Sequence, residues 1–207
     1  MARVRTHTNP LNYYRRMDPL DFSALFPNYN GILDFEVGFG RAVFLESYAK
    51  HHPQRCIVGI EVRKQLVTIC ERRLQKEGIK NARVLHGNAQ ICLEDAMPDK
   101  VIENVFVFHP DPWFKKRHHK RRVVNSAFLD VLSKKMTSNG TFYLSTDVKE
   151  LWEDMMKTIL SHGGFKPLNR DSFWEQFYKT HWQLFSEKDE RETFRGVFQL
   201  AISLSEL

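Results

Sequence analysis

Short apolar segments alternate with longer amphipathic segments along this 207-residue chain, and this alternation restricts its fold more than any other feature. The apolar segments are bounded by glycine, proline or polar residues, as strands are. The segments between them repeat apolar residues every three or four positions, as one face of a helix does. The predicted strands are residues 31–37, 56–61, 82–86, 103–108, 140–145 and 194–203, and the predicted helices are residues 41–51, 63–77, 89–96, 123–136 and 150–162.

The most apolar of these strands, residues 103–108, indicates how the sheet is built. Residues 105–108 read Val-Phe-Val-Phe, so both faces of the strand are apolar. Such a strand is typical of the centre of a parallel sheet that helices cover on both sides. The chain is therefore predicted to be an α/β protein with a doubly wound, mostly parallel sheet. No element is predicted for the aromatic-rich stretch between residue 165 and the last strand.

Cysteine usage and hydropathy indicate the compartment of the protein. Cys56, Cys70 and Cys92 are odd in number, widely spaced and set among apolar neighbours, which is typical of reduced cysteines in a cytoplasmic protein. They form no CxxC pair, so we expect no metal site. No apolar run approaches the roughly 20 residues that cross a bilayer, and the N-terminus lacks the apolar core of a secretory signal. We expect a cytoplasmic protein with no membrane segment.

Positive charge is concentrated in two places. The chain has 31 Lys and Arg against 25 Asp and Glu, for a formal net charge of +6. Residues 1–17 hold four arginines and no acid, and residues 115–122 hold six Lys or Arg and two His. Such patches are typical of proteins with an anionic partner, nucleic acid among them. The length fits one domain over residues 1–207, with a basic N-terminal arm over about residues 1–25.

A glycine-rich turn follows the first predicted strand, in the sequence Glu36-Val37-Gly38-Phe39-Gly40. In such sheets, ligands bind beyond the carboxyl ends of the strands, and an acid about 20 residues further on, here Glu61, holds a ribose. Val43 occupies the place of the third glycine of the dinucleotide fingerprint, which disfavours NAD. Glu36 would repel a pyrophosphate but could hold the ammonium group of S-adenosylmethionine. The alternative is that the two glycines merely end a strand.

Asn88 and Ala89 follow the third predicted strand. The amide of Asn88 could donate to and accept from an adenine edge. Equally, Asn88 could be the N-cap of the helix that begins at Ala89, because asparagine is among the preferred capping residues. The residues alone leave both interpretations open.

The fourth predicted strand ends in the turn His109-Pro110-Asp111-Pro112-Trp113. Its two prolines fix the backbone on either side of Asp111, which holds one carboxylate rigidly beside an aromatic ring. This arrangement suits a planar, nitrogen-rich substrate, although Pro-Asp-Pro also occurs in ordinary turns. The basic run 115–122 begins directly afterwards. Charge runs are commonly solvated faces, but an acid-free run beside a substrate turn favours contact with phosphates.

Taken together, these motifs resemble the tRNA (guanine-N7-)-methyltransferases over nearly the whole chain. The resemblance is carried by Arg3-Val4-Arg5, Asn9-Pro10-Leu11, the glycine-rich turn, Gly59-Ile60-Glu61, Asn88-Ala89, Pro110-Asp111-Pro112-Trp113, Lys116-Arg117-His118, Lys120-Arg121-Arg122 and Thr146-Asp147. It implies the Rossmann-like class I methyltransferase fold, with seven strands in its sheet. It also implies S-adenosylmethionine as cofactor, tRNA as partner, and the variable-loop guanine at position 46 as the methylated base.

The resemblance further implies which residues form the site. Asp111 would be the catalytic residue. The cofactor would be bound by Glu36, Gly38, Gly40, Glu61, Asn88 and Ala89, and the substrate by Lys115, His118, Arg121, Asp147, Thr180 and Gln183. Three departures stand out: Gln183 replaces an expected Glu, Phe114 stands where Pro or His is common, and Ala42 or Val43 stands where many members have a further glycine. The loss of a carboxylate at Gln183 would remove an acceptor for guanine protons.

Two other functions stay open at this point. The same fold could methylate a small nitrogen heterocycle, which the change at Gln183 favours, or the chain could bind tRNA without catalysis. Both basic patches argue against a small neutral substrate, and the presence of Glu36, Glu61 and Asp111 argues against loss of catalysis. Whether the protein is a monomer or a homodimer does not follow from the sequence.

Overall fold

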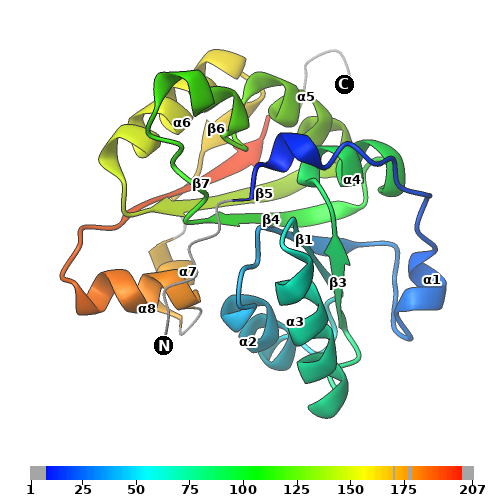
Figure 1. Cartoon of the computed structure of the whole chain (residues 1–207). Helices are drawn as coiled ribbons and strands as arrows, with labels where there is room; N and C mark the ends of the chain where they lie inside the picture. Colours follow the sequence, from blue (N-terminus) through cyan, green and yellow to red (C-terminus); the bar gives the residue numbers. More distant parts are fainter. Residues whose placement is uncertain (1–7, 170, 177–178, 202–207) are drawn as a thin grey trace.

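The computed structural model describes residues 8–169, 171–176 and 179–201, and it contains a seven-stranded sheet with helices on both faces (Figure 1). The order of the strands across the sheet is β3-β2-β1-β4-β5-β7-β6. The strands are β1 (Leu33–Val37), β2 (Ile57–Glu61), β3 (Ala82–His86), β4 (Ile102–Phe108), β5 (Met136–Thr146), β6 (Phe165–Pro167) and β7 (Phe194–Leu200).

The sheet is parallel from β3 to β5, and only β7 runs against its two neighbours within the described residues. The predicted doubly wound, mostly parallel sheet is therefore confirmed. The chain order reverses direction beside β1, whose neighbours are β2 and β4. In open sheets of this type, a crevice forms at that switch point, outside the carboxyl ends of the strands.

Five longer helices cover the sheet, with α4, α5 and α6 on one face and α2 and α3 on the other (Figure 1). Each begins and ends close to its predicted position. The remaining helices lie before the first strand and between later strands. The helices are η1 (Pro10–Asn12), α1 (Phe22–Leu25), α2 (Val43–His51), α3 (Lys64–Lys76), α4 (Ala89–Ala96), η2 (Lys116–Arg121), α5 (Ser126–Lys135), α6 (Lys149–His162), α7 (Asp171–Glu175) and α8 (His181–Lys188).

The bounds of one helix and one strand differ from the prediction by three residues or more within the described residues. The helix predicted over 123–136 begins at Ser126, because the side chain of Asn125 caps it by accepting from the Phe128 N–H at 3.0 Å. At the other end, Met136 is already the first residue of β5, which is longer than the predicted 140–145. A polar segment, Thr137 to Gly140, conceals the start of this strand in the sequence.

Two apolar cores lie on opposite faces of the sheet, and successive residues of β4 contribute to them in turn. Val105 and Val107 pack under α4, α5 and α6, whereas Phe106 and Phe108 pack under α2 and α3. Because side chains alternate along a strand, the run of four apolar residues in β4 reflects burial on both faces. The prediction that this strand lies at the centre of the sheet is confirmed.

The aromatic-rich stretch without a predicted element contains β6, α7 and α8. Phe173 of α7 packs on the second core, with its ring centroid 4.2 Å from that of Tyr143 and 5.9 Å from that of Phe106. Trp174 extends the cluster, 5.0 Å from Phe173. The aromatic residues of this stretch thus cover a sheet face that the longer helices leave open.

The described part of the N-terminal arm lies along α4 and reaches the carboxyl ends of the strands. The Met17 N–H donates to Asp95 at 3.0 Å, and the ring of Tyr13 meets that of His86 edge-on at 5.2 Å. Arg16 forms ion pairs with Asp95 and Glu94. The basic residues Arg3 and Arg5 lie outside the described residues.

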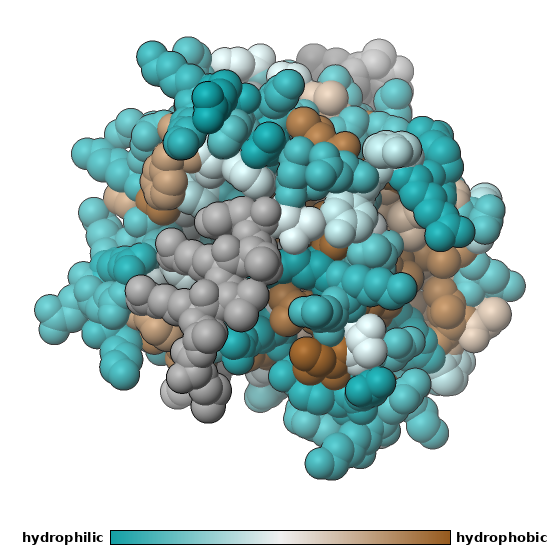
Figure 2. All heavy atoms as spheres, in the orientation of Figure 1, coloured by the Kyte–Doolittle hydropathy of each residue, from teal (hydrophilic) through white to brown (hydrophobic). Residues whose placement is uncertain are grey.

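Hydrophilic side chains cover most of the face shown in Figure 2, and the hydrophobic ones form small, separate groups. Within the described residues, no helix combines the length and the apolar character that a membrane span requires.

Candidate active site

A cavity opens at the carboxyl ends of β1, β2, β3 and β4, the place that the strand order predicts. Each of these strands contributes the residues at its end. The arm and the segment around η2 complete the wall. The residues that line it include Thr8, Pro10, Leu11, Gly38, Glu61, Arg63, Asn88, Ala89, His109, Pro110, Asp111, Trp113, Lys120 and Arg121.

The glycine-rich turn brings backbone close to this cavity. Gly38 and Gly40 have φ angles of +71° and +57°, a region that residues with side chains rarely adopt. The turn is held to the next strand, because the Gly40 N–H donates to the Glu61 carboxylate at 3.1 Å. Gly38 lines the cavity, whereas Gly40 is not among its lining residues. Gly38 therefore forms part of the cavity wall, in addition to following the end of a strand.

Glu36 is a buried acid directly before this turn. It is only 3% exposed, and its Oε2 atom has no hydrogen-bond partner among the described residues. Burial, and then the nearby charge of Glu61, raise the pKa of the Glu36 carboxyl well above its ordinary value. Buried polar atoms without a partner are uncommon and need an explanation. A cationic donor from a ligand would supply the missing partner.

Glu61 ends β2 and lines the cavity. Its carboxylate accepts from Arg63 Nε at 3.0 Å and from the second guanidinium nitrogen at 2.9 Å. Burial by itself lowers the pKa of the Arg63 guanidinium, but the hydrogen bond and charge of Glu61, with the charge of Asp111, raise it. Arg63 thus lies between the acids that follow β2 and β4. In the sequence, only its closeness to Glu61 points to Arg63.

Asn88 is the N-cap of α4, as one of the two interpretations of this residue predicts. Its side-chain oxygen accepts from the Gln90 N–H at 2.9 Å. Its amide nitrogen donates to the Pro10 carbonyl at 3.1 Å, which ties the N-terminal arm to the cavity. Asn88 and Ala89 both line the cavity, so capping does not remove Asn88 from the site.

The turn after β4 has an unusual backbone on both sides of Asp111. His109 and Trp113 have φ angles of +48° and +45°, although neither is glycine. Such conformations are costly and gather at functional sites. Asp111 is exposed at the rim of the cavity. The two prolines restrict the backbone on either side of Asp111, and the two residues with positive φ lie at the ends of the turn.

The basic run follows as η2 and stacks partly on the same turn. The Arg121 guanidinium lies 4.8 Å from the centroid of a Trp113 ring, and the ring of His118 meets Trp113 edge-on at 5.9 Å. Arg121 lines the cavity, whereas Lys115 and His118 lie outside its wall. Phe114 is 63% exposed beside them. The run thus presents cations and one exposed aromatic ring next to Asp111.

Arg122 differs from the rest of the basic run, because it is buried and paired. It donates to the Pro112 carbonyl at 2.9 Å, to Asp154 at 2.8 Å and to Glu150 at 3.2 Å. These contacts fix the Pro-Asp-Pro turn to α6. In the sequence nothing separates Arg122 from its neighbours, but the structure assigns it to the support of the turn.

Replacing Arg122 with methionine should therefore destabilise the fold. Breaking a buried ion pair costs roughly 3–5 kcal/mol, and because Glu150 and Asp154 are partly exposed, we expect about 2 kcal/mol here. Denaturant unfolding measures the change. Lys116→Ala, at an exposed position of the same run, should change the stability by less than about 0.5 kcal/mol. Equal unfolding midpoints for the two variants would contradict the supporting role.

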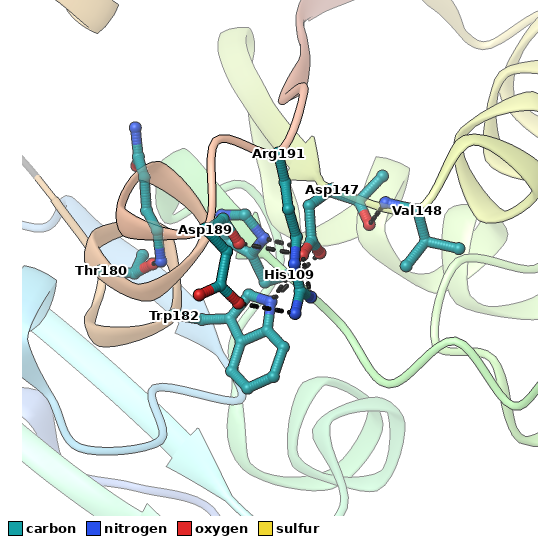
Figure 3. A network of polar contacts seen from close by, with 10 residues as sticks. His109, Asp147, Val148, Thr180, Trp182, Asp189 and Arg191 are labelled. Carbon is teal, nitrogen blue, oxygen red and sulfur yellow. Dashed lines mark hydrogen bonds and ion pairs between the residues drawn. The ribbon is translucent and has the colours of Figure 1, made fainter.

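Asp147, Thr180 and Gln183 do not line the cavity. Thr180 is the N-cap of α8, accepting from the Gln183 N–H at 3.0 Å, and the buried Gln183 side chain donates to Glu187 at 3.4 Å. Asp147, after β5, accepts from Trp182 of α8 and from Arg191 (Figure 3). The three residues thus gather around α8 rather than around Asp111.

His109 is the residue that joins this network to the cavity. It lines the cavity, and its Nδ1 lies 3.5 Å from the Asp147 carboxylate (Figure 3). In the sequence, His109 belongs to the turn, but no motif assigns it a role. Its partner is 38 residues away in the chain, and no local pattern links the two.

Within the described residues, no group of three or more His, Cys, Asp or Glu side chains is arranged to hold a metal ion. Cys56, Cys70 and Cys92 are all buried free thiols.

Comparison with solved structures defines the class of fold. The 16S rRNA methyltransferase KamB superposes with a TM-score of 0.63 over 91% of this chain and 97% of that one, at 15% identity. A SAM-dependent methyltransferase from Aquifex aeolicus gives a TM-score of 0.56 over 84% of this chain and 85% of that one, also at 15% identity. The strand order and these likenesses define the Rossmann-like fold of class I SAM-dependent methyltransferases.

Sequence comparison then defines the family. The profile of the family described as "Putative methyltransferase" matches residues 31–197. The tRNA (guanine-N(7)-)-methyltransferase of Thermosynechococcus vestitus is 31% identical over 95% of this chain and 92% of its own length. That of Nitrosococcus oceani is 38% identical over 74% of this chain, a match that spans 64% of the relative. The chain belongs to the tRNA (guanine-N(7)-)-methyltransferase family.

Proposed function

We propose that this protein transfers a methyl group from S-adenosylmethionine to N7 of a guanine in tRNA, the variable-loop guanine at position 46. One observation carries the proposal. Gly38, the buried Glu61 and the rigid Asp111 turn with the adjoining Arg121 line one cavity, and the buried, unpartnered acid Glu36 lies two residues before Gly38. The names of the relatives support the same reaction.

The residues of the cavity fit S-adenosylmethionine. The unpartnered Oε2 of Glu36 suits the ammonium group of the methionine part, because a buried carboxylate needs a cationic donor. Glu61 would accept from the ribose hydroxyls in place of some of its bonds to Arg63, and Asn88 and Ala89 would lie along the adenine. When bound, this cofactor supplies a methyl group on a positively charged sulfur.

The protein's own contribution would be orientation and charge. Guanine N7 already carries a lone pair, so no side chain has to remove a proton from it, and correct placement supplies much of the rate. Trp113 offers a flat apolar surface to the base. Asp111 would orient the guanine and stabilise the positive charge that develops on it during transfer.

The change at Gln183 favours a small heterocyclic substrate only if this residue faces the substrate. Gln183 is buried in α8, and Glu187 takes its amide hydrogen bond. The observation that supported a small substrate therefore no longer applies. A tRNA-binding protein without catalysis is the remaining alternative.

The test of the proposed function is incubation of the purified protein with labelled S-adenosylmethionine and total tRNA, followed by nucleoside analysis and mapping. We expect 7-methylguanosine at position 46. Label at another guanine would correct the position alone. Binding of tRNA without label would favour the non-catalytic alternative, and label in small heterocycles but not in tRNA would overturn the tRNA substrate.

The basic run should make tRNA binding depend steeply on salt. Each phosphate contact that is lost lowers the slope of log affinity against log salt by roughly 0.7–0.9. Replacing Lys115, Lys116 and Arg117 by alanine should therefore lower the slope by about 2, measured by filter binding from low to high salt. The matched control replaces Lys76, Lys80 and Lys166, which are exposed at the opposite ends of the strands. Equal slopes for both triple variants would refute the phosphate contact.

A further inference from the structure

His109 combines three properties that the proposed reaction does not yet use. Its side chain is only 2% exposed, its backbone has the strained φ angle of +48°, and it lines the cavity beside Asp111. Its own N–H donates to the Ser145 carbonyl at 2.8 Å, which fixes the start of the turn to β5. The backbone thus holds this imidazole in one place, at a cost that suggests a function.

Asp147 orients the imidazole. Its carboxylate is only 4% exposed and also accepts from Trp182 Nε1 at 3.1 Å, Ser186 Oγ at 2.9 Å and Arg191 at 3.1 Å. Burial by itself raises the pKa of this carboxyl, but the hydrogen bonds from His109, Ser186 and Trp182 outweigh that effect and hold the pKa well below its ordinary value. Asp147 is therefore ionised at neutral pH.

An ionised carboxylate beside Nδ1 determines where the imidazole carries its proton. Nδ1 lies 3.5 Å from Asp147 Oδ1, and a carboxylate can only accept, so Nδ1 is the protonated nitrogen. In the tautomer with its proton on Nδ1, Nε2 has a lone pair and accepts. Among the described residues, this Nε2 atom is buried without a hydrogen-bond partner. A buried acceptor that lacks a donor calls for a ligand that brings one.

We propose that Nε2 of His109 accepts a hydrogen bond from the donor edge of the guanine, so that His109 is a specificity-determining residue and Asp147 a positioning residue that acts through it. This inference rests on the proposed function. Guanine carries donors at N1 and at its 2-amino group. Gln183 lacks the carboxylate that would accept guanine protons. The acceptor would instead be His109, in the turn after β4.

The test uses tRNA transcripts that differ only at the methylated position, which the nucleoside mapping identifies. That position carries guanine, hypoxanthine, which lacks the 2-amino group, or 2-aminopurine, which lacks the N1 proton. All three bases retain N7. For the wild-type protein, we expect kcat/KM to fall roughly tenfold on the analogue that lacks the bonded donor, because one hydrogen bond is lost.

His109→Phe should lower kcat/KM on guanine by a similar factor and should show no further loss on that analogue, because the acceptor is already gone. His109→Gln, whose side-chain oxygen can stand near the place of Nε2, should recover part of the preference for guanine. Calorimetric binding of S-adenosylhomocysteine and the thermal midpoint verify that each variant is folded.

Two results would overturn the inference and leave the proposed function intact. One is a loss in His109→Phe that is the same on all three bases, since a purely structural role would lower every rate equally. The other is a wild-type protein that methylates all three bases at the same rate. Absence of 7-methylguanosine with the wild type would instead refute the proposed function itself.

Discussion

Glu36→Gln is expected to weaken binding of S-adenosylmethionine by about 10- to 100-fold, because the hydrogen bond of a charged pair is lost. Glu36 is buried, and its Oε2 has no partner among the described residues. Glutamine has nearly the same shape but cannot offer a negative charge to the ammonium group. Titration calorimetry with S-adenosylhomocysteine, which keeps this ammonium group, measures the loss.

The same substitution should stabilise the free protein at neutral pH. Burial raises the folded-state pKa of Glu36 above its unfolded value of about 4.3. The raised pKa therefore contributes stability that is fully present below about pH 4 and is lost as the pH rises through the folded pKa. Glutamine does not titrate, so the free energy of unfolding of the variant should rise relative to that of the wild type as the pH rises. The difference should exceed about 1 kcal/mol at pH 8.

Denaturant unfolding from pH 4 to pH 8 tests this expectation. Glu71→Gln, at an exposed position of α3, serves as the matched control. Its free energy of unfolding should show the same pH dependence as that of the wild type. If Glu36→Gln also ran parallel to the wild type, Glu36 would be ionised in the free protein. The expected gain in stability would then be wrong, and the calorimetric titration alone would test the role of Glu36 as the partner of an ammonium group.

Asp111→Ala is expected to reduce methyl transfer to tRNA by roughly 100- to 1000-fold while cofactor binding persists. Loss of one preorganised group that stabilises charge in the transition state has an effect of this size. Asp111 is exposed at the rim of the cavity, whereas Glu36, which would hold the cofactor, is buried. Single-turnover rates with saturating tRNA isolate the chemical step from binding.

Glu153→Ala, on an exposed position of α6, is the control for removal of an acidic side chain and should leave the rate unchanged. Calorimetry with S-adenosylhomocysteine should give the same affinity for Asp111→Ala as for the wild type. Retained turnover in Asp111→Ala would remove this residue from the catalytic role. A loss of cofactor affinity instead would assign it to the cofactor site.

Much of the fold follows from the sequence, because the signals for it are local. The alternation along residues 31–162 predicts each strand and each α-helix in that range, and the four apolar residues of β4 identify the centre of the sheet. Where a boundary is wrong, a local signal was overridden. Asn125 caps α5 later than the apolar pattern indicates, and β5 begins at Met136, which pairs with Ile102 of β4 ahead of a polar segment where the register shifts.

The site was predictable wherever a residue follows directly from the end of a strand. Gly38, Glu61, Asn88 and Asp111 each lie there, and parallel strands bring their carboxyl ends to one edge of the sheet. Arg121 was predicted only through the family resemblance, and in the structure it lines the cavity and lies over the Trp113 ring. The division of the basic run into cations at the surface and the buried Arg122 could not be predicted, because it depends on where α6 packs.

The sequence by itself determined the glycine-rich turn and the rigid Asp111 turn, since glycine and proline act on the backbone where they stand, and the alternation of strands and helices predicted the parallel sheet whose edge both turns share. Only the tertiary structure decided what surrounds Asp147. Its partners Trp182, Ser186 and Arg191 are 35 to 44 residues away along the chain, and the packing of α8 brings them to it. A carboxylate accepts from whichever donors the fold presents, so residue type alone could not tell whether Asp147 faces the substrate or orients His109.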